Sequence, residues 1–134
     1  MTTVTFDTNV LLSATLWDGS VSQKVLFDCI QRDVTIYSSS EIIAEYKKVL
    51  KRDFDFTDEE IGELLEKTMA FLKLIEPSEK VDIVKNDPDD NKIIECAIAS
   101  RSRCIITYDK ELLKIKEYQG IKIITPEESR GKYL

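Results

Sequence analysis

The 134-residue chain contains no histidine and only four glycines, and these absences exclude several kinds of catalytic site. Without histidine there is no Ser-His-Asp triad, no Cys-His dyad and none of the usual histidine-bearing zinc or non-haem iron centres. The scattered glycines form neither a Walker loop nor a dinucleotide-binding fingerprint. Any chemistry must therefore come from carboxylates, hydroxyls, amides, lysines or a cofactor that they hold.

Long apolar runs and paired cysteines are missing as well. The longest apolar runs, residues 69–72 and 96–99, have four residues each, which excludes a membrane-spanning helix. The cysteines, Cys29, Cys96 and Cys104, are odd in number, lack CxxC spacing and lie in apolar segments. We therefore expect buried, reduced thiols in a cytoplasmic protein.

Acidic residues are what the chain has in excess. Asp and Glu total 25 against 19 Lys and Arg, which gives a formal charge of −6. The hydrophobic fraction of 43% is ordinary for a globular protein, so we expect one folded domain over residues 1–134. A negative balance argues mildly against nonspecific nucleic-acid binding, but it describes the whole surface and not one cleft.

Strand and helix patterns alternate through most of the chain. Short β-branched or apolar segments predict strands at residues 2–6, 34–37, 81–84, 104–107 and 121–124. Apolar residues at helical spacing predict helices from residue 21, from a capping box at Ser38–Glu41, over 57–75, after the turn at 86–90 and over 109–116. This alternation predicts an α/β fold with a parallel sheet and helices on both of its faces.

Two aspartates follow predicted strands of this sheet, where open parallel sheets place their ligand sites. Asp7 comes directly after the first strand, and Asp109 follows the strand at 104–107. Capping of the next helix is the ordinary alternative for each of them. Glu45 shares a helical face with Ile42 and Val49, so its carboxylate needs a partner, a metal or a route to solvent.

A third acidic group, Asp87, Asp89 and Asp90, lies at a predicted helix N-terminus. The helix dipole accounts for one or two carboxylates there, but three exceed what capping requires, and a cation would relieve their repulsion. Converging carboxylates without histidine or cysteine are typical ligands of Mg²⁺ or Mn²⁺. Such ions activate water and stabilise charge on phosphate oxygens, so the residues indicate hydrolysis of a phosphoester.

Four motifs, in this order, resemble those of PIN domains. They are FDTNVLLS at 6–13, SEIIAE at 40–45, DPDDNKIIECA at 87–97 and ITYDKELL at 106–113. The resemblance extends over residues 2 to about 128, and it is greatest to the small VapC-like toxins of toxin–antitoxin pairs. It implies a three-layer α/β/α sandwich with a central parallel sheet and a metal-dependent nuclease site.

The resemblance also implies the roles of individual residues. Asp7, Glu45, Asp90 and Asp109 would form a catalytic tetrad that binds Mg²⁺ or Mn²⁺. Thr8 and Asn9 would support the first acid, and Thr107 would orient the fourth acid or contact a metal-bound water. The implied substrate is single-stranded RNA, cut by activated water to leave a 3′-hydroxyl and a 5′-phosphate. The implied partners are a second copy of the chain, in a homodimer, and a small antitoxin protein.

Some assignments stay open at the level of sequence. Asp87 and Asp89 compete with Asp90 for the third acidic position, and we favour Asp90 because Ile93, Ile94 and Ala97 match the helix that follows the family's third acid. Glu95 could serve a second metal, but we expect a solvated helix position. The lysines nearest the proposed acids are the best candidates for RNA-backbone contacts: Lys47, Lys48 and Lys110. Trp17 and Tyr108 could stack on a base, but packing is the ordinary role of such residues.

Two other functions compete with the nuclease. A receiver-like phospho-acceptor domain requires paired acids at the end of the first strand, where this chain has one aspartate followed by Thr8 and Asn9. A haloacid-dehalogenase phosphatase requires D-x-D at the same place, and Asn9 replaces its second acid. A non-catalytic binding or scaffold domain of the same fold is the alternative from a different class, and acids at all four motif positions argue against it.

Overall fold

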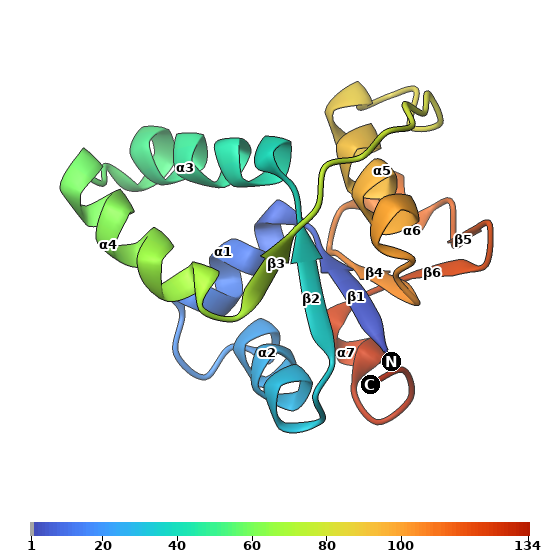
Figure 1. The fold of residues 1–134 in the computed structure, drawn as a ribbon, viewed down its shortest axis with the longest axis horizontal. Helices are drawn as coiled ribbons and strands as arrows, with labels where there is room; N and C mark the ends of the chain where they lie inside the picture. Colours follow the sequence, from blue (N-terminus) through green and yellow to red (C-terminus); the bar gives the residue numbers. More distant parts are fainter. Residues whose placement is uncertain (1) are drawn as a thin grey trace.

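A computed structural model describes residues 2–134, with a six-stranded sheet at its centre (Figure 1). The strand order is β3-β2-β1-β4-β6-β5, and all neighbours run parallel except the antiparallel pair of β5 and β6. The strands are β1 (Thr3–Phe6), β2 (Thr35–Ser38), β3 (Leu72–Leu74), β4 (Cys104–Ile106), β5 (Glu117–Tyr118) and β6 (Ile121–Ile124). The sheet confirms the predicted parallel core, whereas the antiparallel edge strand β5 was not predicted.

Helices cover both faces of the sheet, which confirms the α/β/α architecture. The helices are α1 (Thr8–Leu16), α2 (Val21–Gln31), α3 (Ser40–Phe54), α4 (Asp58–Met69), the 3-10 turn η1 (Pro88–Asp90), α5 (Asn91–Ser100), α6 (Lys110–Leu113) and α7 (Pro126–Ser129). Figure 1 shows α3 and α4 as a helical hairpin extending to one side of the sheet, with α5 and α6 on the other side.

The two faces of the sheet bury separate apolar clusters because successive strand residues point in opposite directions. In β4, Cys104 and Ile106 pack into the cluster formed with α1–α4, whereas Ile105 packs into the cluster formed with α5 and α6. This strand is therefore buried on both faces, as its continuous apolar sequence predicts. Because β4 is paired with β1 on one side and β6 on the other, the strand end that precedes Thr107 is held in place.

The predicted strand at 81–84 is wrong, and so is the predicted extension of the preceding helix to residue 75. The helix α4 ends at Met69, and the next strand is β3, in which Leu72 pairs with Ile36 of β2. Residues 81–84 are a loop whose backbone N–H groups bind side chains instead of a neighbouring strand. The apolar residues of this loop still pack inward, which is why they resemble a strand in the sequence.

Two helix starts also differ from expectation. Ser39, not Ser38, caps α3, and its hydroxyl accepts the N–H of Ile42 at 3.4 Å. Ser38 instead ends β2, opposite Leu74 of β3. The helix α1, which begins directly after β1, was not predicted, because its apolar residues are buried on nearly every side and leave little amphipathic signal.

The thiols of Cys29, Cys96 and Cys104 are buried and unpaired, as predicted. Burial raises the pKa of each thiol to about 12, so these cysteines are packing residues and not nucleophiles. Among residues 2–134, no helix combines the length and the apolar character needed to cross a bilayer.

Candidate metal centre

The site is built where β1 and β4 end side by side in the middle of the sheet. Phe6 pairs with Ile106 in parallel register, and the N–H of Asp7 donates to the carbonyl of Ile106 at 3.0 Å. Asp7 and Thr107 therefore leave their strands at the same edge. The strand order changes direction between β1 and β4, and this is where open α/β sheets form their ligand crevices.

Asp7 is only 4% exposed, and hydrogen bonds fix both of its oxygens. The N–H of Thr8 donates to Oδ1 at 2.7 Å, and the hydroxyl of Thr107 donates to Oδ2 at 2.6 Å. Burial raises the pKa of Asp7 to about 6, because desolvation outweighs these two hydrogen bonds and the nearby charges of Asp109 and Glu45 add to it. Thr8 contacts the first acid, as its predicted supporting role requires, whereas Thr107, predicted to orient the fourth acid, donates its hydroxyl to the first.

Thr107 links Asp7 to Asp109. Its hydroxyl donates to Asp7 and accepts the backbone N–H of Asp109 at 2.9 Å. Asp109 also caps the short helix α6, because its Oδ1 accepts the N–H groups of Glu111 and Leu112. The capping role given as the alternative for Asp109 is therefore observed, and it places the carboxylate at the same edge of the sheet as Asp7.

The segment before α5 brings further carboxylates to this edge. Asp87, Asp90 and Asp109 each offer an oxygen, and these oxygens lie within 4.8 Å of one another. Oδ2 of Asp90 is buried and has no hydrogen-bond partner among the described residues. Burial, followed by the proximity of Asp109, raises the pKa of Asp90 to about 8. The exposed Asp89 lies outside this trio.

The loop that carries these acids is held by two side chains of α5. Asn91 accepts the N–H groups of Ile83 and Val84, each at 2.9 Å, and donates to the carbonyl of Pro88 at 3.0 Å. Glu95 is 5% exposed and accepts the N–H of Val81 at 3.0 Å, so the expected solvated position for it is wrong. The sequence offers no signal for these contacts, because they form only when the loop folds back on the helix.

Replacement of Asn91 by alanine is expected to destabilise the fold by about 2–4 kcal/mol, because two backbone N–H groups would lose their acceptor. Urea unfolding measures this change. The matched control is Asn86→Ala, which removes one exposed hydrogen bond to Glu111 and should stay within about 0.5 kcal/mol of wild type. Equal stability of the two variants would contradict the bracing role of Asn91.

Glu45 lies on α3 beside these acids, with both of its oxygens engaged. The hydroxyl of Thr8 donates to Oε1 at 2.5 Å, and Nζ of Lys92 lies 3.0 Å from Oε2. Lys92 was not among the predicted site residues, although its position two residues after Asp90 places it in the first turn of α5. Glu45 is half-buried, so it neither joins the apolar core nor faces open solvent.

The predicted tetrad meets in one cavity of about 200 Å³. Acids are six of its ten lining residues, and Arg52 is the only cation among them. The lining residues are Asp7, Thr8, Asn9, Glu45, Val49, Arg52, Asp87, Asp89, Asp90 and Asp109. The structure therefore brings all four predicted acids together, with Asn9 at the same cavity and Thr107 behind Asp7.

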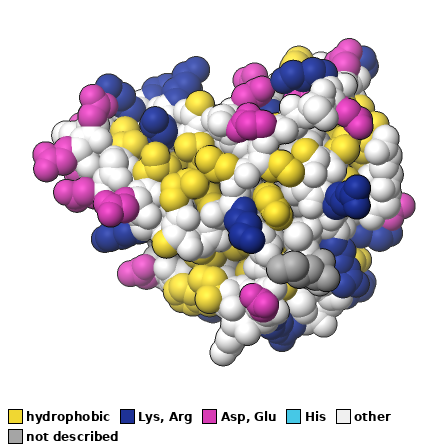
Figure 2. Space-filling view, viewed as in Figure 1, with side chains coloured by type: hydrophobic (Ala, Val, Ile, Leu, Met, Phe, Trp, Pro, Cys, Tyr) yellow, Lys and Arg dark blue, Asp and Glu magenta, His cyan; other side chains and the backbone are white. Residues whose placement is uncertain are grey.

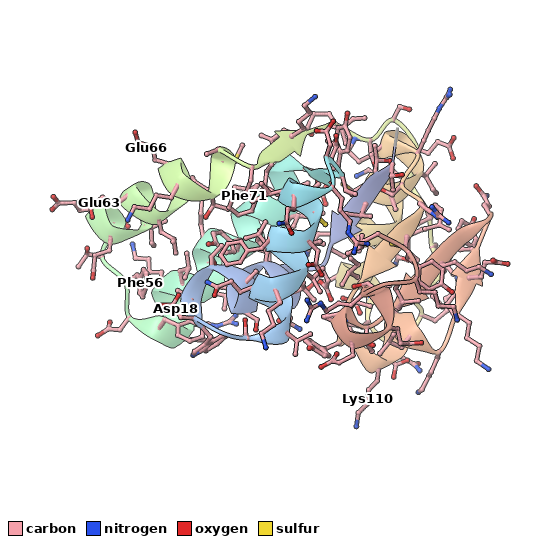
Figure 3. The ribbon with its side chains drawn as sticks, turned by 90° about the horizontal axis from the view of Figure 1, so that it is seen from below. Asp18, Phe56, Glu63, Glu66, Phe71 and Lys110 are labelled. Carbon is pink, nitrogen blue, oxygen red and sulfur yellow. The ribbon has the colours of Figure 1, made fainter. Side chains whose placement is uncertain are left out.

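The predicted RNA-contact lysines lie farther out. Lys47 and Lys48 line a separate groove of about 550 Å³ between α3 and α4. Lys110 is exposed next to Asp109 and extends away from the body of the molecule (Figure 3). Trp17 packs edge-on against Phe54, with ring centroids 5.7 Å apart, and remains half-exposed.

The donor set of the cavity fits a hard divalent cation. All of its acidic ligands are carboxylates, which Mg²⁺ and Mn²⁺ prefer over softer donors. The unpartnered oxygen of Asp90 and the close approach of Asp87, Asp90 and Asp109 are unfavourable without a positive charge among them. The residues present therefore match the cofactor that the sequence predicts.

Comparison with known proteins gives one family and one curated relative. The PIN domain family matches residues 3–111 of the chain. The uncharacterized protein MJ1680 of Methanocaldococcus jannaschii is 28% identical over 137 aligned positions, which cover 93% of this chain and 87% of that protein.

Two solved structures share the fold. VapBC2 from Rickettsia felis, crystallised with a DNA fragment from its promoter, contains a chain that matches with a TM-score of 0.66 and 18% identity. That match covers 90% of this chain and 96% of the other. PAE2754 from Pyrobaculum aerophilum matches with a TM-score of 0.54 and 15% identity, over 91% of this chain and 89% of the other. At these identities the likeness is one of fold.

Proposed function

The chain belongs to the PIN domain family, and from this premise we propose that it is a metal-dependent endoribonuclease that cleaves single-stranded RNA. The observation that carries the proposal is the cavity at the ends of β1 and β4, where Asp7, Glu45, Asp90 and Asp109 meet. A receiver-like function loses its basis, because the family match selects the PIN interpretation. A non-catalytic scaffold remains the competing hypothesis, and an activity assay separates it from the nuclease.

The proposed catalytic acids would bind the metal, and neighbouring groups would orient them. Asp7, Asp90 and Asp109 would hold Mg²⁺ or Mn²⁺ together with Glu45, and Asp87 is close enough to join them. A bound divalent ion lowers the pKa of water and stabilises negative charge on phosphate oxygens. Thr107 and the N–H of Thr8 hold the Asp7 carboxylate in one orientation, so this ligand needs little rearrangement.

Basic residues in and around the cavity would receive the RNA backbone. Arg52 lines the cavity directly. Its Nε and Nη2 donate to Asp53 at 2.7 and 3.0 Å, so its Nη1 would contact a phosphate oxygen. Lys110 is exposed beside Asp109, and Lys47 and Lys48 lie on the same helix as Glu45. Arg52 and Lys110 would hold the phosphates at the acidic cavity, and Lys47 and Lys48 would contact the backbone farther out, in the groove between α3 and α4. Hydrolysis would leave a 3′-hydroxyl and a 5′-phosphate.

A labelled single-stranded RNA tests the proposed activity directly. Cleavage is expected with Mn²⁺ or Mg²⁺, and none is expected with chelator. Asp7→Asn should reduce cleavage by more than about 100-fold, because changes in residues that merely support metal ligands already cost about 10- to 100-fold. Equal cleavage by Asp7→Asn and wild type, or full activity in chelator, would contradict the proposal. Either result would indicate a contaminating nuclease and leave the scaffold hypothesis.

We also propose that the nuclease is the toxin of a toxin–antitoxin pair, acting in the cytoplasm as a homodimer restrained by a small antitoxin. The fold shared with a chain of VapBC2 supports this assignment. The groove between α3 and α4 suits an acidic amphipathic partner segment, because Ile61 and Leu65 line it together with three lysines. Figure 2 shows basic side chains over α3 and acidic ones along α4.

A further inference from the structure

Among residues 2–134, Lys92 is the least exposed lysine that forms an ion pair. Its side chain is 13% exposed, and its Nζ lies 3.0 Å from Oε2 of Glu45. The other lysines that form ion pairs are at least 46% exposed. An ammonium group loses much of its hydration in such a position, so it is tolerated only with a fixed counter-charge.

Glu45 differs from the other described acids of the cavity because a lysine ammonium lies against one of its oxygens. Thr8 donates to Oε1, and Lys92 donates to Oε2. The carboxylates of Asp87, Asp90 and Asp109, by contrast, approach one another without a basic partner, and Oδ2 of Asp90 has no partner at all. The acidic site therefore has two parts. Among the described residues, Asp87, Asp90 and Asp109 have no basic partner, whereas Glu45 already has one, Lys92.

We propose that Lys92 is a positioning residue for Glu45 and neutralises its charge, so that the cavity takes up a single divalent cation on the side of Asp90 and Asp109. This inference rests on the proposed metal-dependent function. An ammonium is a compact point charge with three N–H donors, one of which Glu45 accepts. It can therefore neutralise a carboxylate beside the metal without recruiting another ion.

The geometry explains why a second ion is unnecessary beside Glu45. Two-metal nuclease sites place their ions about 4 Å apart, so both ions need carboxylates that are free to bind them. Glu45 is the acid of the tetrad that Lys92 neutralises, and it lies outside the close trio of carboxylates. Loss of the ammonium would leave Glu45 with one unpaired oxygen in an acidic cavity, where a second cation would be attracted.

Counting bound Mn²⁺ tests the inference without using activity. Calorimetry, together with electron paramagnetic resonance of unbound Mn²⁺, should give one ion per chain for wild type and a shift to two ions for Lys92→Met. Lys92→Arg, which keeps the charge, should stay at one ion. Lys85→Met is the matched control, because Lys85 pairs with Asp82 in an exposed ion pair outside the site, and it should also stay at one.

The outcomes separate the two proposals. Two ions on wild type would overturn the role of Lys92 even if Lys92→Met does not fold, and one ion on both folded proteins would overturn it as well. In either case the metal-dependent nuclease would stand. No Mn²⁺ on wild type would overturn the proposed function and the inference together. If Lys92→Met is unfolded by circular dichroism, Lys92→Gln carries the same expected shift.

Discussion

Asparagine in place of Asp90 is expected to raise the melting temperature of the metal-free protein while abolishing RNA cleavage. Oδ2 of Asp90 is buried without a partner, and burial together with Asp109 raises its pKa to about 8. At neutral pH the unfolded chain ionises Asp90 and the folded protein resists this ionisation. A neutral amide of the same shape removes that cost, so we expect a gain of a few degrees. The same change removes a proposed metal ligand, and activity should fall by more than about 100-fold.

Asp89→Asn is the matched control, because Asp89 is exposed, precedes Asp90 directly and lies outside the close carboxylate trio. We expect this variant to keep its activity and to melt within about a degree of wild type. Thermal unfolding in chelator and cleavage with Mn²⁺ measure the two properties separately. If Asp89→Asn loses activity and Asp90→Asn keeps it, the third catalytic acid is Asp89 and not Asp90.

The metal-free protein is expected to become more stable as the pH falls from 8 to 5. The pKa of Asp7 rises from 3.8 to about 6 in the folded protein, and that of Asp90 rises from 3.8 to about 8. A raised carboxyl pKa destabilises the folded state fully above the folded value, and this cost disappears as the pH falls towards the unfolded value. For Asp7 the shift of roughly 2 pKa units corresponds to about 3 kcal/mol.

Urea unfolding at a series of pH values in chelator measures this slope. Saturating Mn²⁺ should flatten or reverse it, because a cation stabilises the charged carboxylates and protons compete with the cation for them. The useful window ends near pH 5, since Asp53 and Glu60 have lowered pKa values and lose their stabilising contacts at lower pH. A metal-free protein that loses stability steadily from pH 8 to pH 5 would contradict the strained acidic site.

The fold was largely predictable because its strands carry strong local patterns. The segment around Ile105 is short, apolar and buried on both faces, and it is a strand as expected. The loop at 81–84 has a similar composition, but its N–H groups bind the side chains of Asn91 and Glu95, which lie 7 to 14 residues further along the chain. Local pattern alone could not reveal that this backbone is satisfied by side chains and not by a neighbouring strand.

The candidate site was predictable in its acids but not in its cations. Asp7 and Asp109 follow strands, so the rule that ligand sites form at strand ends finds both of them. Lys92 looks like an ordinary charged residue at a helix start, and only the packing of α5 against α3 places it on Glu45. Lys47 and Lys48 were chosen for nearness in sequence, yet their side chains line the neighbouring groove between α3 and α4.

The pairing of β1 with β4 has a consequence for how the protein is made. Asp7 and Thr107 are 100 residues apart in sequence, yet one hydrogen bond joins them. Closing such a long loop is slow, and the central strand β4 cannot take its place before most of the chain has left the ribosome. Because Asp109 comes later still, the acidic site assembles only after residues 7–109 have all been made. A nascent chain that has not yet reached Asp109 therefore lacks the complete acidic site.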